Sequence, residues 1–283
     1  MVTNAVWYDI NKDGQNDLLV CCEWGGIYAF INSNGKFMKR TLTEKSGWWN
    51  FILPVDADND GDIDIIAGNL GLNSFLRASA SEPVRLYYND FDDNGKKEQV
   101  VTYYLQHKEI TLAGKDELQK QIPELKKKYI YAGDFAKASF NDIFSPERIK
   151  SATILTADYF ANAILINDGN LNFKTEALPW EAQLSTYRDA VLVNANDDSL
   201  PDVLLVGNYY PNSMHSGRND ADYGSILINK GKGTFEGEPL NGVVLKGESR
   251  HIRQINIQHR QAYVAARNND SVQVLMFKEK KMR

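Results

Sequence analysis

Short hydrophobic runs separated by polar turns repeat along most of the chain. Apolar stretches at 18–20, 63–67 and 100–104 each follow a cluster of Asp, Asn and Gly residues, which is the pattern of β-strands bounded by tight turns. Asn-x-Gly sequences between apolar flanks at 165–173 and 227–235 predict hairpins, and these two segments align residue for residue. The pattern therefore predicts an internally repeated, all-β protein.

The repeated strands also predict the architecture. Units of a few short strands are typical of a β-propeller, and we expect a single domain over residues 1–283 with about six or seven four-stranded blades. A β-helix is the alternative, although its repeats are much shorter. The expected units lie near residues 2–43, 49–90, 96–135, 150–180, 186–241 and 248–278.

One segment, near residues 115–150, breaks this pattern. Leu118, Ile122, Leu125 and Tyr129 recur at the spacing of one helix face. We therefore expect a short helical insertion on the propeller, and the lysine run within it is expected to be its solvated face.

Acidic residues are concentrated in four windows of nine residues each. The windows at 9–17, 56–64, 90–98 and 194–202 hold 15 of the 37 Asp and Glu residues. Carboxylates packed this closely repel one another unless a cation or solvent separates them. In the first three windows, oxygen-bearing side chains occupy positions 1, 3, 5 and 9, and Gly occupies position 6.

This spacing predicts calcium-binding loops in the first three windows. Ca²⁺ prefers about six to eight oxygen ligands, which alternate residues of a tight loop supply, with a backbone carbonyl at position 7. Glycine at position 6 permits the positive φ of the turn. An EF-hand would instead close with Glu at position 12 between two helices. The alternative interpretation is a set of solvated Asp/Asn/Gly turns.

The fourth window has amides at positions 1 and 3 and Ser at position 6, so we expect a weaker fourth site. The expected metal-ligating positions are Asp9, Asn11, Asp13, Gln15, Asp17, Asp56, Asp58, Asp60, Asp62, Asp64, Asp90, Asp92, Asn94, Lys96, Glu98, Asn194, Asn196, Asp198, Leu200 and Asp202.

Composition narrows the class of protein. Hydrophobic residues make up 43% of the chain and charged residues 24%, as in ordinary folded proteins. The net charge of −5 argues against a nucleic-acid partner, and no apolar run is long enough for a transmembrane helix. The two cysteines, Cys21 and Cys22, are neighbours that are poorly placed to bridge each other, which excludes a disulfide scaffold.

The Asp-x-Asp-x-Asp-Gly loops followed by hydrophobic strands resemble FG-GAP/VCBS repeats, as in the propeller of integrin α chains. The segments at 47–50, 68–73 and 266–270 resemble Bacteroidetes proteins of the ASPIC/UnbV type. This resemblance implies structural Ca²⁺ and an exported protein, which is periplasmic, outer-membrane-associated or extracellular. Because the chain begins directly in a strand-like segment, we expect it to be the C-terminal part of a longer protein that carries the signal sequence.

Two segments are candidates for ligand recognition. The long loop at 208–224 carries aromatic, basic and acidic residues, and long loops on rigid scaffolds often bind ligands. The pair of adjacent tryptophans at 48–49 is either a stacking surface for sugars or peptides, or part of the packing between blades. The candidate ligand-binding residues are Tyr209, Tyr210, His215, Arg218, Asp220, Asp222, Trp48 and Trp49.

Two classes of function follow. None of the four histidines lies in a catalytic or metal-binding motif, so we expect no catalytic residues and no enzyme. The first class is a non-enzymatic, calcium-binding propeller that recognises a protein or glycan. The alternative is a polysaccharide hydrolase or lyase that uses the acids of the 208–224 loop. The sequence specifies neither the ligand nor the oligomeric state.

Overall fold

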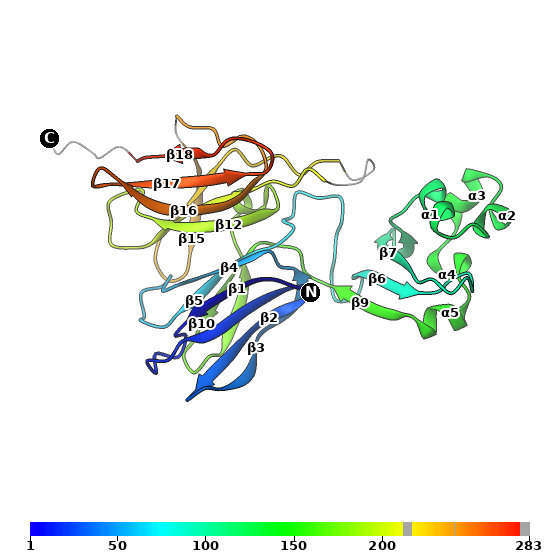
Figure 1. Cartoon of the computed structure of the whole chain (residues 1–283), viewed down its shortest axis with the longest axis horizontal. Coiled ribbons are helices and arrows are strands. Elements are labelled where there is room, and N and C mark those ends of the chain that lie inside the picture. The colour runs from blue at the N-terminus through cyan, green and yellow to red at the C-terminus, as the bar shows by residue number, and fades with distance from the viewer. Residues whose placement is uncertain (212–216, 241, 278–283) are drawn as a thin grey trace. The chain divides into compact units, whose positions relative to one another are not determined.

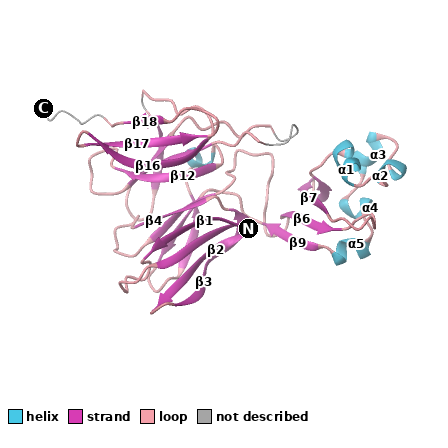
Figure 2. Ribbon diagram, viewed as in Figure 1, coloured by secondary structure: helices cyan, strands magenta, loops and turns pink. Residues whose placement is uncertain are grey.

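The computed structural model describes residues 1–211, 217–240 and 242–277 of the chain (Figure 1). The chain divides into two compact units: unit 1 contains residues 1–75 and 160–283, and unit 2 contains residues 76–159. Antiparallel strands dominate the structure, which confirms the all-β class (Figure 2). Because the chain divides into two compact units, a single domain over residues 1–283 stays a prediction.

Unit 1 contains four antiparallel sheets within its described residues, which we number I to IV. Sheet I consists of β1 (Val2–Tyr8), β2 (Asp17–Ser33) and β3 (Lys36–Trp48). Sheet II consists of β4 (Phe51–Val55), β5 (Asp64–Gly68), β10 (Ala163–Asn167) and β11 (Phe173–Ala177). Sheet III consists of β12 (Tyr187–Val193), β13 (Asp202–Gly207), β14 (Ser225–Asn229) and β15 (Phe235–Pro239), and it follows the 3₁₀-helix η1 (Trp180–Gln183). Sheet IV consists of β16 (Ser249–Ile257), β17 (Arg260–Arg267) and β18 (Gln273–Leu275).

Sheet II is assembled from two distant parts of the chain. The chain leaves the sheet after β5, forms unit 2, and returns with β10, which pairs antiparallel with β5. The expected units at 49–90, 96–135 and 150–180 are therefore wrong, because their boundaries do not coincide with sheets. Hydrophobic pattern identifies a strand but does not identify the strand beside it, so the hairpin at 165–173 was counted as a separate unit.

Sheets II and III have the same order of strands. In each, two strands joined by an acidic window are followed by an excursion and then by an Asn-x-Gly hairpin that completes the sheet. In sheet II the excursion is residues 69–162, and in sheet III it is residues 208–224. The 208–224 loop is therefore the connection in sheet III that corresponds to the connection of sheet II into which the whole of unit 2 is inserted.

The core of unit 1 lies between successive sheets. One cluster joins sheets II and III and includes the buried rings of Phe51 and Tyr187. A second cluster joins sheets III and IV and includes Ile252 and Tyr263. Gly68 permits the close approach of sheets II and III, since a Cβ there would lie 2.2 Å from the Phe51 ring and 2.8 Å from the carbonyl oxygen of Tyr187. The first strands of the sheets contact one another in the order β1, β4, β12 and β16.

Unit 2 combines one sheet with a helical segment (Figure 2). Its sheet has the order β8 (Lys108–Thr111), β7 (Glu98–Leu105), β6 (Val84–Asn89) and β9 (Thr153–Ala157). The predicted helical segment is present as α1 (Lys115–Gln121), α2 (Leu125–Lys128), α3 (Ala132–Lys137), α4 (Phe140–Ile143) and α5 (Pro146–Ser151). All four residues predicted to form its apolar face, Leu118, Ile122, Leu125 and Tyr129, are buried against Tyr87 and Val100 of the sheet. No helix in the described part of the chain has the length and apolar character needed to span a membrane.

Candidate functional site

The four acidic windows form four loops, each between two antiparallel strands. Loop 1 (residues 9–17) joins β1 to β2, loop 2 (56–64) joins β4 to β5, loop 3 (90–98) joins β6 to β7, and loop 4 (194–202) joins β12 to β13. In every loop the last acid is the first residue of the following strand. Loop 3 belongs to unit 2, and the other three belong to unit 1.

The loops share a backbone conformation. Position 4 is left-handed in all four, with φ between 58° and 63°, and Gly14, Gly61 and Gly95 at position 6 have φ of 84°, 95° and 82°. The glycine prediction is thus confirmed for loops 1 to 3, whereas Ser199 of loop 4 has no positive φ. In each loop the side chain at position 5 also accepts a hydrogen bond from the backbone N–H of position 7, at 2.7–2.8 Å. Asx turns of this kind fold the loop locally.

The acid at position 9 closes each loop by binding backbone N–H groups. Asp64 is fully buried; its Oδ2 accepts from Ala57 N at 2.9 Å and its Oδ1 from Asn167 N at 2.8 Å. In sheet III, Asp202 likewise accepts from Ala195 N of loop 4 and from Asn229 N of the hairpin between β14 and β15. This interaction joins the loop to the hairpin that completes the sheet, and we call it the carboxylate latch.

The latch is repeated in sheet I and partly in unit 2. Asp17 accepts from Ile10 N and from Asn32 N, and Glu98 accepts from Phe91 N at 2.8 Å. In sheets I to III the hairpin Asn also donates its side-chain N–H to the carbonyl of loop position 8. The sequence identified these Asn residues only as turn formers, so it missed their role in holding the loop.

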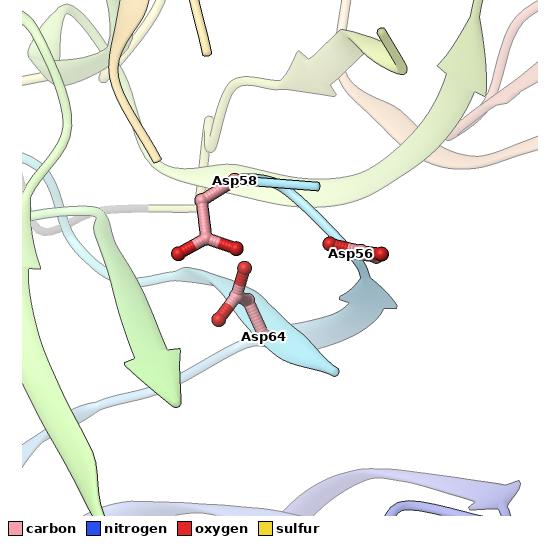
Figure 3. Close-up of side chains that lie close together, drawn as sticks. All are labelled: Asp56, Asp58 and Asp64. Carbon is pink, nitrogen blue, oxygen red and sulfur yellow. The ribbon is translucent and has the colours of Figure 1, made fainter. Parts of the chain in front are cut away.

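Loops 2 and 3 bring three carboxylates together. Asp56, Asp58 and Asp64 each place an oxygen within 4.8 Å of the others, and Figure 3 shows the carboxyl groups of Asp58 and Asp64 pointing toward each other. Asp90, Asp92 and Glu98 form the matching group in loop 3. These are positions 1, 3 and 9 of each loop.

Each of these two groups contains a buried oxygen that hydrogen bonding leaves unsatisfied. Asp56 Oδ1 and Asp92 Oδ1 are shielded from solvent and accept no hydrogen bond from the described residues. A buried carboxylate oxygen without a partner is unfavourable. A hard divalent cation that prefers oxygen ligands would supply the missing partner, so the residues of loops 2 and 3 fit Ca²⁺.

Electrostatics point the same way in both loops. Burial raises the pKa of Asp64 to about 6, and the carboxylates of Asp58 and Asp60 contribute to this increase. Burial also raises the pKa of Asp58, and that of Glu98, where Asp92 and Asp90 contribute. A bound cation would reverse this effect, because it favours the ionised carboxylates.

Loops 1 and 4 differ from loops 2 and 3 in having amide side chains that donate to an acid of the same loop. In loop 1, the Asn11 amide donates to Asp13. In loop 4, the amides of Asn194 and Asn196 both donate to Asp198. Amide donors thus perform part of the role that a cation would have in these loops.

The comparison with protein families agrees with the loop geometry. Residues 9–67 match the family model described as FG-GAP-like repeat. This segment is similar to an FG-GAP-like repeat. The matched segment contains loops 1 and 2 and the strands from β2 into β5. Loop 4 lies outside the matched segment and has the same carboxylate latch. No curated protein matches the chain.

The 208–224 loop contributes buried and exposed residues. Asp222 is buried and accepts from Gly224 N, while Asp220 is exposed, so these two acids do not form an exposed pair. Burial raises the pKa of Asp222 to about 7. Tyr209 and Tyr210 are half-buried, and the Tyr210 ring stacks with the exposed Arg218. His215 lies outside the described residues.

The two tryptophans have different environments. Trp49 is fully buried and its indole N–H donates to the Lys45 carbonyl, so its ring packs in the core and cannot present a face to a ligand. Trp48 is half-buried and packs against Trp24 and Phe160, with ring centroids 5.2 and 4.9 Å apart. This environment agrees with the packing interpretation of the pair, although the indole Nε1 of Trp48 is buried without a hydrogen-bond partner among the described residues.

The structure also groups Tyr209 with two arginines and an asparagine that the sequence did not indicate. Arg188, at the start of β12, donates from Nη1 to Asn50 Oδ1 at 2.6 Å. The guanidinium groups of Arg188 and Arg250 both stack with the ring of Tyr209, at 4.6 and 5.8 Å from its centroid. These residues come from sheets II, III and IV and from the 208–224 loop, so no local sequence motif connects them.

Proposed function

We propose that this protein is an exported, non-enzymatic, calcium-binding β-propeller that recognises a protein or glycan. The observation that carries the calcium proposal is the pair of buried, unpartnered carboxylate oxygens, Asp56 Oδ1 and Asp92 Oδ1, within clusters of three acids. The FG-GAP-like repeat supports a repeat-containing domain of a recognition protein. Contact between the first strands of successive sheets supports the propeller architecture.

Calcium would have a structural role in this proposal. In loop 2 the ligands are the carboxylates of Asp56, Asp58 and Asp64 with the backbone carbonyl of Asp62, and in loop 3 the equivalent positions hold the second ion. A third ion would bind loop 1, and loop 4 would be the weakest site. Ions that bind only the folded protein stabilise it by mass action. Loop sites of modest affinity suit the high calcium concentration outside the cell, which supports an exported location.

The geometry favours recognition over polysaccharide cleavage. A glycosidase of the usual type uses two carboxyl groups that face the substrate together. In the 208–224 loop, Asp222 is buried and hydrogen-bonded within the fold, whereas Asp220 is exposed. We therefore propose no catalytic role for these acids.

Thermal unfolding tests the proposal. The protein is stripped with EDTA and then measured with Ca²⁺ or Mg²⁺ added back. We expect a rise of several degrees with Ca²⁺ and little change with Mg²⁺, because Mg²⁺ requires a smaller octahedral site and dehydrates reluctantly. Asp92→Asn should remove the response of loop 3, whereas Asp134→Asn, at an exposed position of α3, should keep the full response. An equal response to both metals, or none, would contradict the proposal.

A further inference from the structure

Arg188 is the second residue of β12 and lies at the end of that strand opposite loop 4. It is hydrogen-bonded to Asn50, which precedes β4, and it is within electrostatic range of Glu23 on β2 and of Arg250 on β16. Trp48 is the cross-strand partner of Glu23. Its backbone N–H donates to the side chain of Asn69, and the backbone carbonyl of Asn69 accepts from the Asn50 side chain. Glu23 and Asn50 therefore connect Arg188 to the strand that carries Trp48.

Arg188 has no carboxylate in direct contact, although Glu23 and Glu248 act on it at a distance. It makes no ion pair within the described residues, and its Nε is buried without a hydrogen-bond partner. The second arginine, Arg250, is paired with Glu248 at 2.7 Å, and Glu248 also accepts from Asn268. Burying a guanidinium that has no directly paired carboxylate is unfavourable. Stacking on the ring of Tyr209 offsets only part of this cost. Burial and the nearby Arg250 both lower the pKa of Arg188.

We propose that Arg188, assisted by Arg250 and Tyr209, binds the carboxylate of an acidic sugar. This inference rests on the recognition function proposed above, but not on calcium binding. The planar guanidinium matches a carboxylate in shape and donates two parallel hydrogen bonds to it. A carboxylate adds one negative charge beside Glu23 and Glu248, whereas a dianionic phosphate would add two.

A buried donor on the connected strand favours a sugar over an acidic peptide. The indole Nε1 of Trp48 is a second buried donor without a partner, and Trp24 packs edge-on against the same ring. A sugar acid offers hydroxyl oxygens to such donors in addition to its carboxylate, and its C–H faces pack on aromatic rings. An Asp or Glu side chain offers the carboxylate alone.

Calorimetric titration of the calcium-saturated protein tests this inference. The probes are trimers of galacturonate, glucuronate and mannuronate, the methyl-esterified form of each trimer, and a tetra-aspartate peptide. We expect at least one uronate trimer to bind and its uncharged ester to bind at least tenfold more weakly. Binding of none of the trimers, equal binding of the ester, or equal or tighter binding of the peptide would overturn the inference.

Variants locate the site. Arg188→Gln should weaken uronate binding at least tenfold, and Arg188→Lys should weaken it less, because lysine keeps the charge but loses the planar fork. Arg260→Gln, at the exposed opposite end of sheet IV, should bind as the unmodified protein does. If Arg188→Gln does not fold, Arg250→Gln serves in its place. Unchanged binding by a folded variant would overturn the inference.

The calcium response of each variant separates the two proposals. An intact response to Ca²⁺ without uronate binding refutes the sugar site alone. Uronate binding without a calcium response refutes the structural calcium proposal and leaves the sugar site standing.

Discussion

Replacing Asp56 by Asn distinguishes a calcium site from an ordinary turn. The substitution keeps the size of the side chain and removes one of three carboxylates that lie within 4.8 Å of one another. At that separation each like-charge pair costs about 1 kcal/mol in bulk water and about 3 kcal/mol at an effective dielectric constant of about 20. Asp56 takes part in two such pairs. In EDTA we therefore expect Asp56→Asn to stabilise the protein by about 2 kcal/mol or more, equivalent to roughly 4–8 °C in Tm.

Calcium should cancel this advantage. At a free Ca²⁺ concentration of about 100 times Kd, the occupied site stabilises the unmodified protein by about 2.7 kcal/mol. The variant has replaced a charged carboxylate ligand by a neutral amide, so its response should fall to below about 1 kcal/mol. The assay is urea or thermal unfolding of both proteins in EDTA and in a calcium series, with Asp134→Asn as the control.

The pH dependence in EDTA has a defined sign. The pKa of Asp64 is raised to about 6 from its ordinary value of 3.8, so the folded state holds this proton more tightly than the unfolded state does. The stabilisation is fully present below pH 3.8 and is lost as the pH rises through 6. The advantage of Asp56→Asn should therefore be small near pH 4 and grow toward pH 7. A variant that is destabilised equally in EDTA and in Ca²⁺ would refute this reasoning and make loop 2 an ordinary turn.

Three further changes have defined outcomes. Asn229→Ala removes the hydrogen bonds from the Asn229 amide to the carbonyl groups of Ala57 and Pro201. It should lower the free energy of unfolding by about 1–3 kcal/mol in urea titrations, and no loss would show that this amide is dispensable. Gly68→Ala should prevent folding or lower Tm steeply, because its Cβ would lie 2.2 Å from the Phe51 ring, whereas Gly133→Ala meets no atom within 4 Å and should be neutral or slightly stabilising. Asp222 should titrate near pH 7 when its carboxyl group is followed by ¹³C NMR, and a midpoint near 4 would contradict the burial argument. The stability that it contributes should be complete below pH 3.8 and fall as the pH rises through 7, and Asp222→Asn should lack this pH dependence.

The acidic loops show how far consecutive residues can be interpreted without a structure. The nine-residue spacing, the glycine at position 6 and the strand that follows were all predicted for loops 1 to 3, because each depends on contacts within one turn of chain. The apolar face of the helical segment was predicted for the same reason, since helical neighbours are close in sequence. The weaker fourth site stays a prediction, which rests on the amides and serine of loop 4.

Features that join distant segments depended on the tertiary structure. The pairing of β10 with β5, across all of unit 2, is a long-range choice among strands of similar hydrophobic pattern, and the sequence assigned that hairpin to a unit of its own. The latch has the same origin, because Asp64 and Asn167 become neighbours only when the sheet closes. Arg188 gave no sequence signal, since its neighbours Asn50, Tyr209 and Arg250 come from separate elements. Sequence determined the strands, the turns and their local chemistry; folding decided which of them lie together, because strand pairing and charge burial are properties of residues far apart in the chain.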